Sequence, residues 1–248
     1  MAESSITTNG PVADPTWGAT GRPGGPAAGP YRTMAESVAA EIHHLILTGE
    51  FAPGEALRIQ DLAERFQTSS MPVREALRQL SATGIVDVAP HRGARVARIS
   101  VEDLDDTFAV RLALEPMATR LAAENMTEQQ VALAADAFDR YMALLDSGDV
   151  DHARRAHAEF HFAIYHAAGS KWLLRAIDPV WHNTERYRFA WGDGGAEQRR
   201  RAHTEHLRIL TTCRDGDVEA AATAMQEHLD HAHRRIRAAI LHLEENGD

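Results

Sequence analysis

The sequence predicts a mainly α-helical protein, in which a winged helix-turn-helix precedes an antiparallel, all-helical bundle. Residues 35–83 show three helical periods separated by short turns, and two alternating apolar segments follow them. From Ser100 onward the chain shows only long helical periods with short breaks. The first 30 residues are rich in Gly, Pro, Ala, Ser and Thr, which predicts a disordered tail. We therefore expect a tail at 1–30, a winged domain at 31–98 and a helical domain at 99–248.

The winged domain is predicted element by element from periodicity and turn residues. Apolar side chains at Val38, Ile42 and Leu45 indicate a first helix, which Gly49 ends. Ser69 is a suitable N-cap for the third helix, because Pro72 then falls in the first turn, where a missing N–H costs little. The expected elements are helices at Ala35–Thr48, Ile59–Phe66 and Pro72–Thr83, and strands at Ile85–Val88 and Ala94–Ile99 around a turn at His91-Arg92-Gly93.

The helical domain is predicted from capping residues and helix breakers. Ser100 begins a capping sequence, Thr127 and Gln130 form a capping box, and Asp149 is suited to cap the third helix. Short Gly-containing breaks separate the helices, which favours antiparallel neighbours. The expected helices span roughly 100–124, 127–146, 149–168, 171–189, 196–214 and 218–243, with WGDGG as a loop.

Composition limits the compartment and the class of protein. The chain has 248 residues, 44% of them hydrophobic, and a single cysteine, Cys213. One thiol cannot form an internal disulfide, so a reducing compartment is expected. The sequence has no apolar run long enough for a membrane span and no secretion signal. We expect a cytoplasmic protein with no membrane association.

The charge is unevenly distributed along the chain. The formal net charge is −10, yet residues 31–100 contain as many arginines as acidic residues. The segment from Ala89 to Ile99 holds Arg92, Arg95 and Arg98 and no acidic residue. A local basic patch is sufficient for binding phosphate groups, so the overall acidity does not exclude a nucleic acid partner.

The third helix of the winged domain carries the candidate DNA contacts. A recognition helix places its N-terminal half against base edges in the major groove, where an Arg can bind guanine with two hydrogen bonds. The arginine at the predicted hairpin tip would enter the adjacent minor groove. Winged helices also dock proteins, and Arg74 paired with Glu75, or Arg78 paired with Asp87, would be an alternative. The predicted DNA-binding residues are Ser69, Ser70, Met71, Arg74, Arg78 and Arg92.

This region resembles a known family. The stretch PGEALRIQDLAERFQTSSMPVREALRQLSATGIVDVAPHRGARV is similar to the N-terminal domain of GntR-type bacterial transcription regulators, and MPVREALRQL followed by Gly and RG is its most specific part. The resemblance covers residues 31–98 and implies DNA binding. The family often has Arg where this chain has Ser70, so one base contact is absent or replaced.

Two histidines in HAEFH raise the question of a metal site. His157 and His161 are four residues apart and so share one face of a helix. In the zinc-hydrolase pattern HExxH the Glu directly follows the first His, but here Ala158 holds that place. Glu159 is turned by about 100° from it and points away from a metal-bound water. The spacing therefore disfavours a hydrolase.

Three predicted helices bring imidazoles to apolar faces. Phe160 and Ile164 flank the two histidines of HAEFH, His206 lies beside an apolar stripe, and His228 lies among Ala and Leu residues. A buried imidazole without a partner is costly, and several together are best explained by a shared cation. The predicted metal ligands are His157, His161, His206 and His228.

A second resemblance covers residues 101–243. RLALEPMATRLAAEN, HAEFHFAIYHAAGS, TEHLRIL and MQEHLDHA are similar to the helical FCD effector domain of the FadR subgroup, in which an Asp and three His usually bind a divalent metal. The Asp position of that pattern falls on His157 here. Four neutral ligands favour Zn²⁺, or Ni²⁺, over harder ions. Alternatively His157 does not ligate and a water or an effector carboxylate takes its place, and His203 and His231 are rival ligands.

The same resemblance implies an effector site. Arg111 in RLALE matches the effector-binding Arg of the family, and a guanidinium can hold a carboxylate at two points. A surface pair between Arg111 and Glu115 is the alternative. Asn183 is a further candidate for the pocket lining.

These predictions combine into one function and two alternatives. The first is a homodimeric repressor that binds a palindromic DNA operator and responds to a small carboxylate bound at the metal site. The second is a metal-dependent helical-bundle enzyme with a DNA-binding head, although Glu205-His206 and Glu227-His228 lack the Glu-x-x-His spacing of di-metal oxidases. The third is a metal-ion sensor.

Overall fold

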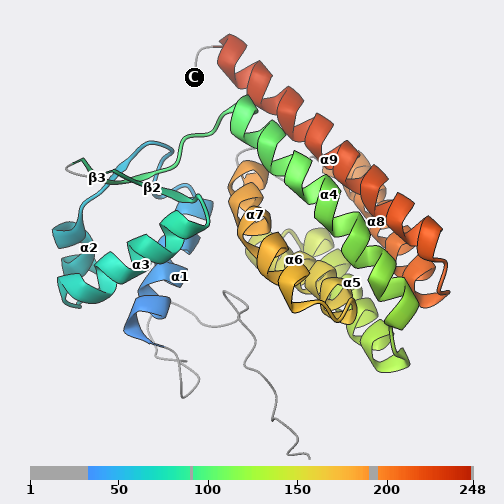
Figure 1. The fold of residues 1–248 in the computed structure, drawn as a ribbon. Helices are drawn as coiled ribbons and strands as arrows, with labels where there is room; N and C mark the ends of the chain where they lie inside the picture. The colour runs from blue at the N-terminus through green and yellow to red at the C-terminus, as the bar shows by residue number, and fades with distance from the viewer. Residues whose placement is uncertain (1–32, 90–91, 190–194, 247–248) are drawn as a thin grey trace, which may run out of the picture.

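The computed structural model describes residues 33–89, 92–189 and 195–246. Figure 1 shows a small domain with three helices and a sheet beside a long helical bundle, joined by the segment that leads from β3 into α4. The predicted tail, His91 of the predicted turn and most of the WGDGG loop lie outside the described residues. Among the described residues, the predicted order of a winged helix-turn-helix followed by helices is confirmed.

The small domain packs three helices against a three-stranded antiparallel sheet. Its core is formed by apolar side chains from every element, among them Ile42, Leu62, Leu77 and Val86. The strand order is β1-β3-β2, so the hairpin strand β3 is central. The elements are α1 (Met34–Leu47), β1 (Ala56–Leu57), α2 (Ile59–Arg65), α3 (Ser70–Ala82), β2 (Val86–Ala89) and β3 (Gly93–Val96).

The main differences between the small domain and the prediction are at α3, β1 and β3. α3 begins at Ser70 rather than Pro72, because Ser69 already has the extended backbone of an N-cap, although its side chain makes no capping hydrogen bond. β1 was not predicted, because two residues show no alternation and are extended only through pairing with β3. β3 ends at Val96 rather than Ile99, because its pairing with β2 ends there.

The bundle helices begin where the capping residues predicted. Ser100 accepts a hydrogen bond from the Asp103 amide, and Asp149 accepts one from the His152 amide. The capping box of Thr127 and Gln130 is formed. The helices are α4 (Val101–Asn125), α5 (Glu128–Ser147), α6 (Val150–Ala167), α7 (Lys171–Phe189), α8 (Gly195–Arg214) and α9 (Val218–Asn246). Among the described residues, none of these helices is long and apolar enough to cross a membrane.

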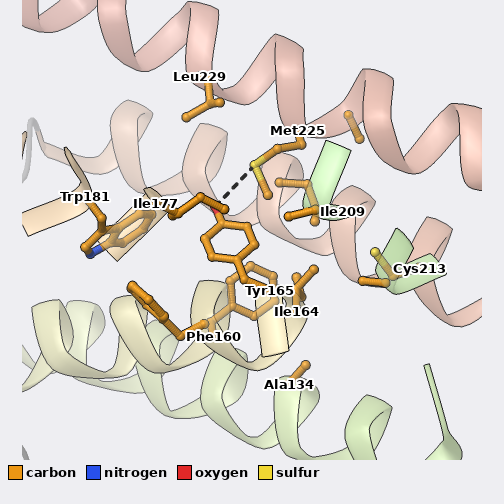
Figure 2. Close-up of a cluster of buried hydrophobic side chains, with 14 of the residues drawn as sticks. Ala134, Phe160, Ile164, Tyr165, Ile177, Trp181, Ile209, Cys213, Met225 and Leu229 are labelled. Atoms are coloured by element: carbon orange, nitrogen blue, oxygen red, sulfur yellow. Dashed lines mark hydrogen bonds between the residues drawn. The ribbon is translucent and has the colours of Figure 1, made fainter. Parts of the chain in front are cut away.

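The bundle core surrounds a polar centre with large apolar side chains. α4 packs mainly on α9, and α5 on α6. Figure 2 shows Phe160 and Tyr165 of α6, Trp181 of α7 and Met225 of α9 converging in this core. Each is buried, and burying such a side chain stabilises the fold by about 1.5–3 kcal/mol. The core therefore fixes the helices from which the candidate site is built.

Candidate functional site

Four buried histidines meet inside the bundle. α6 supplies His157 and His161 from adjacent turns, α8 supplies His206, and α9 supplies His228. All four are buried, and one ring nitrogen of each lies within 4.8 Å of the others. The residues that the sequence pattern selected are thus brought together.

Three of the ring nitrogens form a compact triangle. The Nε2 atoms of His157 and His206 are 3.0 Å apart, and Nε2 of His161 lies 3.2 Å from the first and 3.1 Å from the second. Two nitrogens bound to one tetrahedral Zn²⁺ at ~2.0–2.1 Å are separated by about 3.3 Å. The triangle is therefore close to the spacing that a single ion requires.

Hydrogen bonds at the opposite ring nitrogens fix how two of these imidazoles are protonated. Nδ1 of His206 lies 2.6 Å from the Ala202 carbonyl, which can only accept, so Nδ1 carries the proton. Tyr165 donates to Glu115 over 2.5 Å, and its oxygen lies 3.2 Å from Nδ1 of His161, which therefore donates to it. Burial and the Glu115 carboxylate hold the pKa of Tyr165 well above its usual value, so the phenol keeps its proton.

This arrangement turns lone pairs toward one another. In the neutral rings, Nε2 of His206 and Nε2 of His161 are both unprotonated, and they face each other across 3.1 Å. Two lone pairs at that distance repel unless a cation lies between them. Orienting a ligand histidine through its second nitrogen is the usual support of a metal site.

His228 is oriented by a carboxylate. Its Nδ1 lies 2.9 Å from Glu205, and the other oxygen of Glu205 lies 2.8 Å from Nδ1 of His231. Burial alone would raise the pKa of Glu205, but the hydrogen bonds and charges of His228 and His231 lower it overall. Glu205 therefore stays ionised and supports the cluster from outside, and His231 contacts it rather than joining the four.

The positions of Glu159, His203 and His157 test the alternative interpretations of the HAEFH segment and its ligands. Glu159 is exposed and forms an ion pair with Arg140 at 2.6 Å, so it is turned away from the histidines as predicted. His203 is exposed and its ring lies against Phe138. His157, at the position where the FCD pattern has Asp, stacks on Trp181 with ring centroids 5.5 Å apart.

A cavity of about 760 Å³ opens beside the histidine cluster. Three of the four histidines line it, and its apolar wall includes Phe108, Tyr141 and Leu229. It is also rich in guanidinium groups, which favour anionic ligands. The arginines in its lining are Arg111, Arg154, Arg199, Arg201 and Arg235, and the acidic residues are Asp149, Asp151 and Glu205.

Arg111 lies at the inner end of this cavity, in a fixed position. Its Nε and Nη2 donate to the two oxygens of Glu115 over 2.5 and 3.1 Å, and Nη1 donates to Thr184 over 3.0 Å. The pair with Glu115 that was considered as an alternative is thus formed, but it is buried rather than at the surface. These bonds use three of the five N–H groups of a guanidinium, which leaves two directions for a ligand.

Asn183 does not line this cavity. Its side chain is buried on another face of α7, and its Nδ2 donates to the Thr83 carbonyl at the end of α3 over 3.3 Å. The structure therefore places Asn183 between the two domains and not beside the histidines.

The residues predicted to contact DNA are exposed on the small domain. Met71 is 74% exposed, and Arg74 is exposed and takes part in no ion pair among the described residues. Arg78 forms a two-pronged ion pair with Glu75, not with Asp87. Ser69, Ser70 and Arg92 are exposed as well.

Several residues at the site were not assigned from the sequence. Tyr165 follows His161 by four residues, a spacing that could have indicated contact. Glu205 acts across two helices, which no local pattern reveals. Cys213 is buried, and burial raises its thiol pKa to about 12, which disfavours the reactive thiolate.

Comparisons with known proteins match both domains. Residues 34–96 match the model of bacterial regulatory proteins of the gntR family, and residues 106–231 match the FCD domain, which is consistent with the FadR subgroup. The transcriptional repressor GlaR of Escherichia coli is 31% identical over 74% of this chain and 87% of its own length. The Nta operon transcriptional regulator of Aminobacter aminovorans is 30% identical over 77% of this chain and 90% of its own. The solved structure of E. coli McbR/YncC aligns with a TM-score of 0.75 at 25% identity, covering 84% of this chain and 99% of that one.

Proposed function

The chain belongs to the GntR family of DNA-binding transcription regulators and carries an effector-binding FCD domain, and from this premise we propose that a histidine-bound metal and a small carboxylate together control its affinity for DNA. The matched relatives are regulators rather than enzymes, so the cavity serves recognition. We place the domain boundary at 98/99, between the two matched regions.

The metal proposal rests on the nitrogen triangle. His157, His161 and His206 supply three nitrogens at ligand spacing, and His228 supplies the fourth. Four imidazoles favour Zn²⁺, with Ni²⁺ as the second choice. A bound ion would supply a positive centre that can accept an anionic ligand. The hydrogen bonds that the rings donate to Tyr165, Glu205 and the Ala202 carbonyl hold the rings in place for it.

The carboxylate proposal rests on the charge of the cavity. Arg111 reaches its inner end beside the histidines, and Arg235 and Arg199 line it farther out. A small organic acid would place its carboxylate near the metal and the free N–H groups of Arg111, and its apolar part against Phe108 and Leu229. Asn183 is not part of this proposal, because it lies outside the cavity.

The DNA proposal combines the exposed face of α3 with a dimer. Arg74 is the principal base contact, with Ser69, Ser70 and Met71 beside it, Arg78 as a lesser contact and Arg92 on the adjacent groove. Two copies of the chain would present two such helices to a palindromic operator. Ligand binding would favour one arrangement of the domains over another and so relieve repression.

Metal content tests the first step. We expect one ion per chain after mild dialysis, measured by inductively coupled plasma mass spectrometry, and complete loss in His206→Ala. Zn²⁺ at 100 times its Kd should stabilise the chelator-treated wild type by about 2.7 kcal/mol, read as a rise in Tm. The matched control is His203→Ala, an exposed imidazole one turn away on α8, which should retain the ion. Equal metal loss in both variants, or no uptake of Zn²⁺ or Ni²⁺ by the wild type, would refute the site.

A further inference from the structure

One turn of α7 touches both domains. On its inner side, Trp181 stacks on His157, and the guanidinium of Arg111 lies 4.7 Å from the Trp181 ring. Thr184, one turn along on the same side, accepts a hydrogen bond from Arg111. The inner side of this turn is therefore in contact with both the histidine cluster and the cavity arginine.

The opposite side of the same turn contacts the small domain. Residues 182, 183 and 186 fall on one face of an α-helix, about 100–200° from residue 181. His182 meets His43 of α1 with ring centroids 5.7 Å apart, and Asn183 donates to the carbonyl of Thr83. Arg186 donates to the Arg98 carbonyl over 2.7 Å and pairs with Asp103, so it holds the segment between the domains. Figure 1 shows α7 as the bundle helix that faces α1 and α3.

The contact at Asn183 is shaped by a glycine. Gly84 follows α3 with φ +72°, and a Cβ atom there would lie 2.5 Å from Nδ2 of Asn183. Any side chain at this position would push the amide away from the Thr83 carbonyl. The end of the recognition helix is thus fitted to one side chain of the bundle, and the 3.3 Å hydrogen bond is long enough to be released readily.

We propose that residues 181–186 of α7 couple the metal and ligand cavity to the DNA-binding domain, with Asn183 as the latch that holds the end of the recognition helix. The inference rests on the proposed function, since it needs the cavity to bind a metal or ligand. Occupation of the cavity changes the positions of Trp181 and Arg111, the turn of α7 moves with them, and the latch at Thr83 is strengthened or released. Asn183 is a positioning residue, because it touches neither ligand nor DNA.

Hydrogen exchange measures the latch without any knowledge of the operator or the effector. Full-length protein is stripped with a chelator and compared with and without Zn²⁺, and exchange is followed by mass spectrometry at residues 83–85 and 97–103. In the wild type we expect Zn²⁺ to change the exchange rate of both segments at least threefold. In Asn183→Ala both segments should exchange faster, and their response to Zn²⁺ should fall below 1.5-fold.

A second variant tests the same contact in case Asn183→Ala does not fold. Gly84→Ala should reproduce the loss of response through the clash with Asn183. Gly169→Ala is the matched control, because Gly169 also has a positive φ (+69°) at a helix end, just after α6, with no atom within 4 Å of the added Cβ, and it should keep the wild-type response.

The outcomes separate this inference from the proposed function. If Zn²⁺ binds and raises Tm but leaves both segments unchanged in the wild type, the coupling is refuted and the metal site stands. If Asn183→Ala and Gly84→Ala keep the full Zn²⁺ response, the latch is refuted. Failure of Zn²⁺ to bind would overturn both proposals.

Discussion

At the scale of single residues, the pair of Arg111 and Glu115 explains how a charge is kept buried beside the cavity. Burying two charges is costly unless further hydrogen bonds complete their shells. Here Tyr165 donates to Glu115 and Thr184 accepts from Arg111, so the pair is satisfied on both sides. The Glu115 carboxylate raises the pKa of Arg111 against the opposing effect of burial, so the guanidinium stays charged. Glu115 therefore neutralises part of the charge of the guanidinium that a ligand carboxylate would bind.

Removing the negative charge of Glu115 should strengthen ligand binding. In Glu115→Gln, Arg111 keeps its position but loses its counter-ion, so the carboxylate that best stabilises the wild type should bind about tenfold more tightly, since a charge-assisted hydrogen bond contributes ~1.5–3 kcal/mol. In the double variant Arg111→Met/Glu115→Gln, which leaves no buried charge unpaired, affinity should fall at least tenfold. Titration calorimetry, with Tm measured for each protein, gives both values.

These two variants separate the effect of Arg111 on ligand binding from its effect on the stability of the fold. Each variant is compared with its own unliganded state, so a change in fold stability does not count as a change in binding. Arg111 would lose its assigned role if the double variant bound the acid as tightly as the wild type.

Residue patterns predicted the four histidines but not what orients them. His157 and His161 share a face because of their spacing, and each of the other two lies in an apolar helical stripe. The hydrogen bond that His228 donates to Glu205, and the orientation of Asn183 away from the cavity, depend on the rotation of whole helices in the bundle. Local periodicity carries no information about that rotation beyond the apolar stripe.

At the scale of elements, the helix ends were predictable because they depend on local chemistry. Ser100, Thr127 and Asp149 cap α4, α5 and α6 through their own side chains. β1 was not predictable, because its two residues are extended only where β3 pairs with them. The body of α3 was predictable as well, because its buried residues follow the apolar helical period. Its exposed N-terminal residues remain available to contact a partner.

The exposed first turn of α3 leads to a prediction about DNA. Arg74 is exposed with no ion-pair partner among the described residues, whereas the Arg78 guanidinium is engaged by Glu75. Arg74→Ala should weaken binding to the operator by about 1–3 kcal/mol, the contribution of a two-pronged contact to guanine. Arg78→Ala should weaken it less. The operator is the duplex that the wild type selects from a random library, and fluorescence anisotropy gives the affinities.

An arginine of the bundle provides a control for the loss of one positive charge anywhere on the protein. Arg120→Ala removes an exposed arginine that pairs with Glu219, far from α3 in the fold, and should leave DNA affinity unchanged. Binding of random duplex should also change little in Arg74→Ala. A uniform loss on every sequence would mean that Arg74 contacts phosphate rather than a base.

At the scale of the whole molecule, the two domains meet through polar and ring contacts rather than a shared apolar core. The two apolar clusters are separate, one in each domain. The contacts that join them, His43 with His182 and Thr83 with Asn183, involve residues with no common pattern in the sequence. The relative placement of the domains was therefore beyond what periodicity or motif spacing predicts.

The contact between His43 and His182 makes the packing of the two domains sensitive to acid. Burial, followed by the nearby His182, Arg154 and His44, lowers the pKa of His43 to about 3, and its Nε2 has no hydrogen-bond partner among the described residues. His43 is therefore neutral in the folded protein. In an opened or unfolded chain its pKa returns to about 6.5, so the unfolded state takes up the proton. The contribution of neutral His43 to the free energy of unfolding is therefore fully present above pH ~6.5. It decreases as the pH falls toward 3, by up to about 1.4 kcal/mol per pH unit.

Thermal unfolding at pH 7.5 and 5.5 tests this sign. The wild type should lose about 3–5 °C more in Tm than His43→Gln over that interval, because only the wild type has this imidazole to protonate on opening. The titration of all other groups is common to both proteins and cancels in the comparison. His44→Gln, at the next residue on α1, controls for the loss of an imidazole from the same helix and should lose nearly as much Tm as the wild type, because His43 is still present to protonate. An equal loss in His43→Gln would mean that the imidazole at the domain contact does not cause the acid sensitivity.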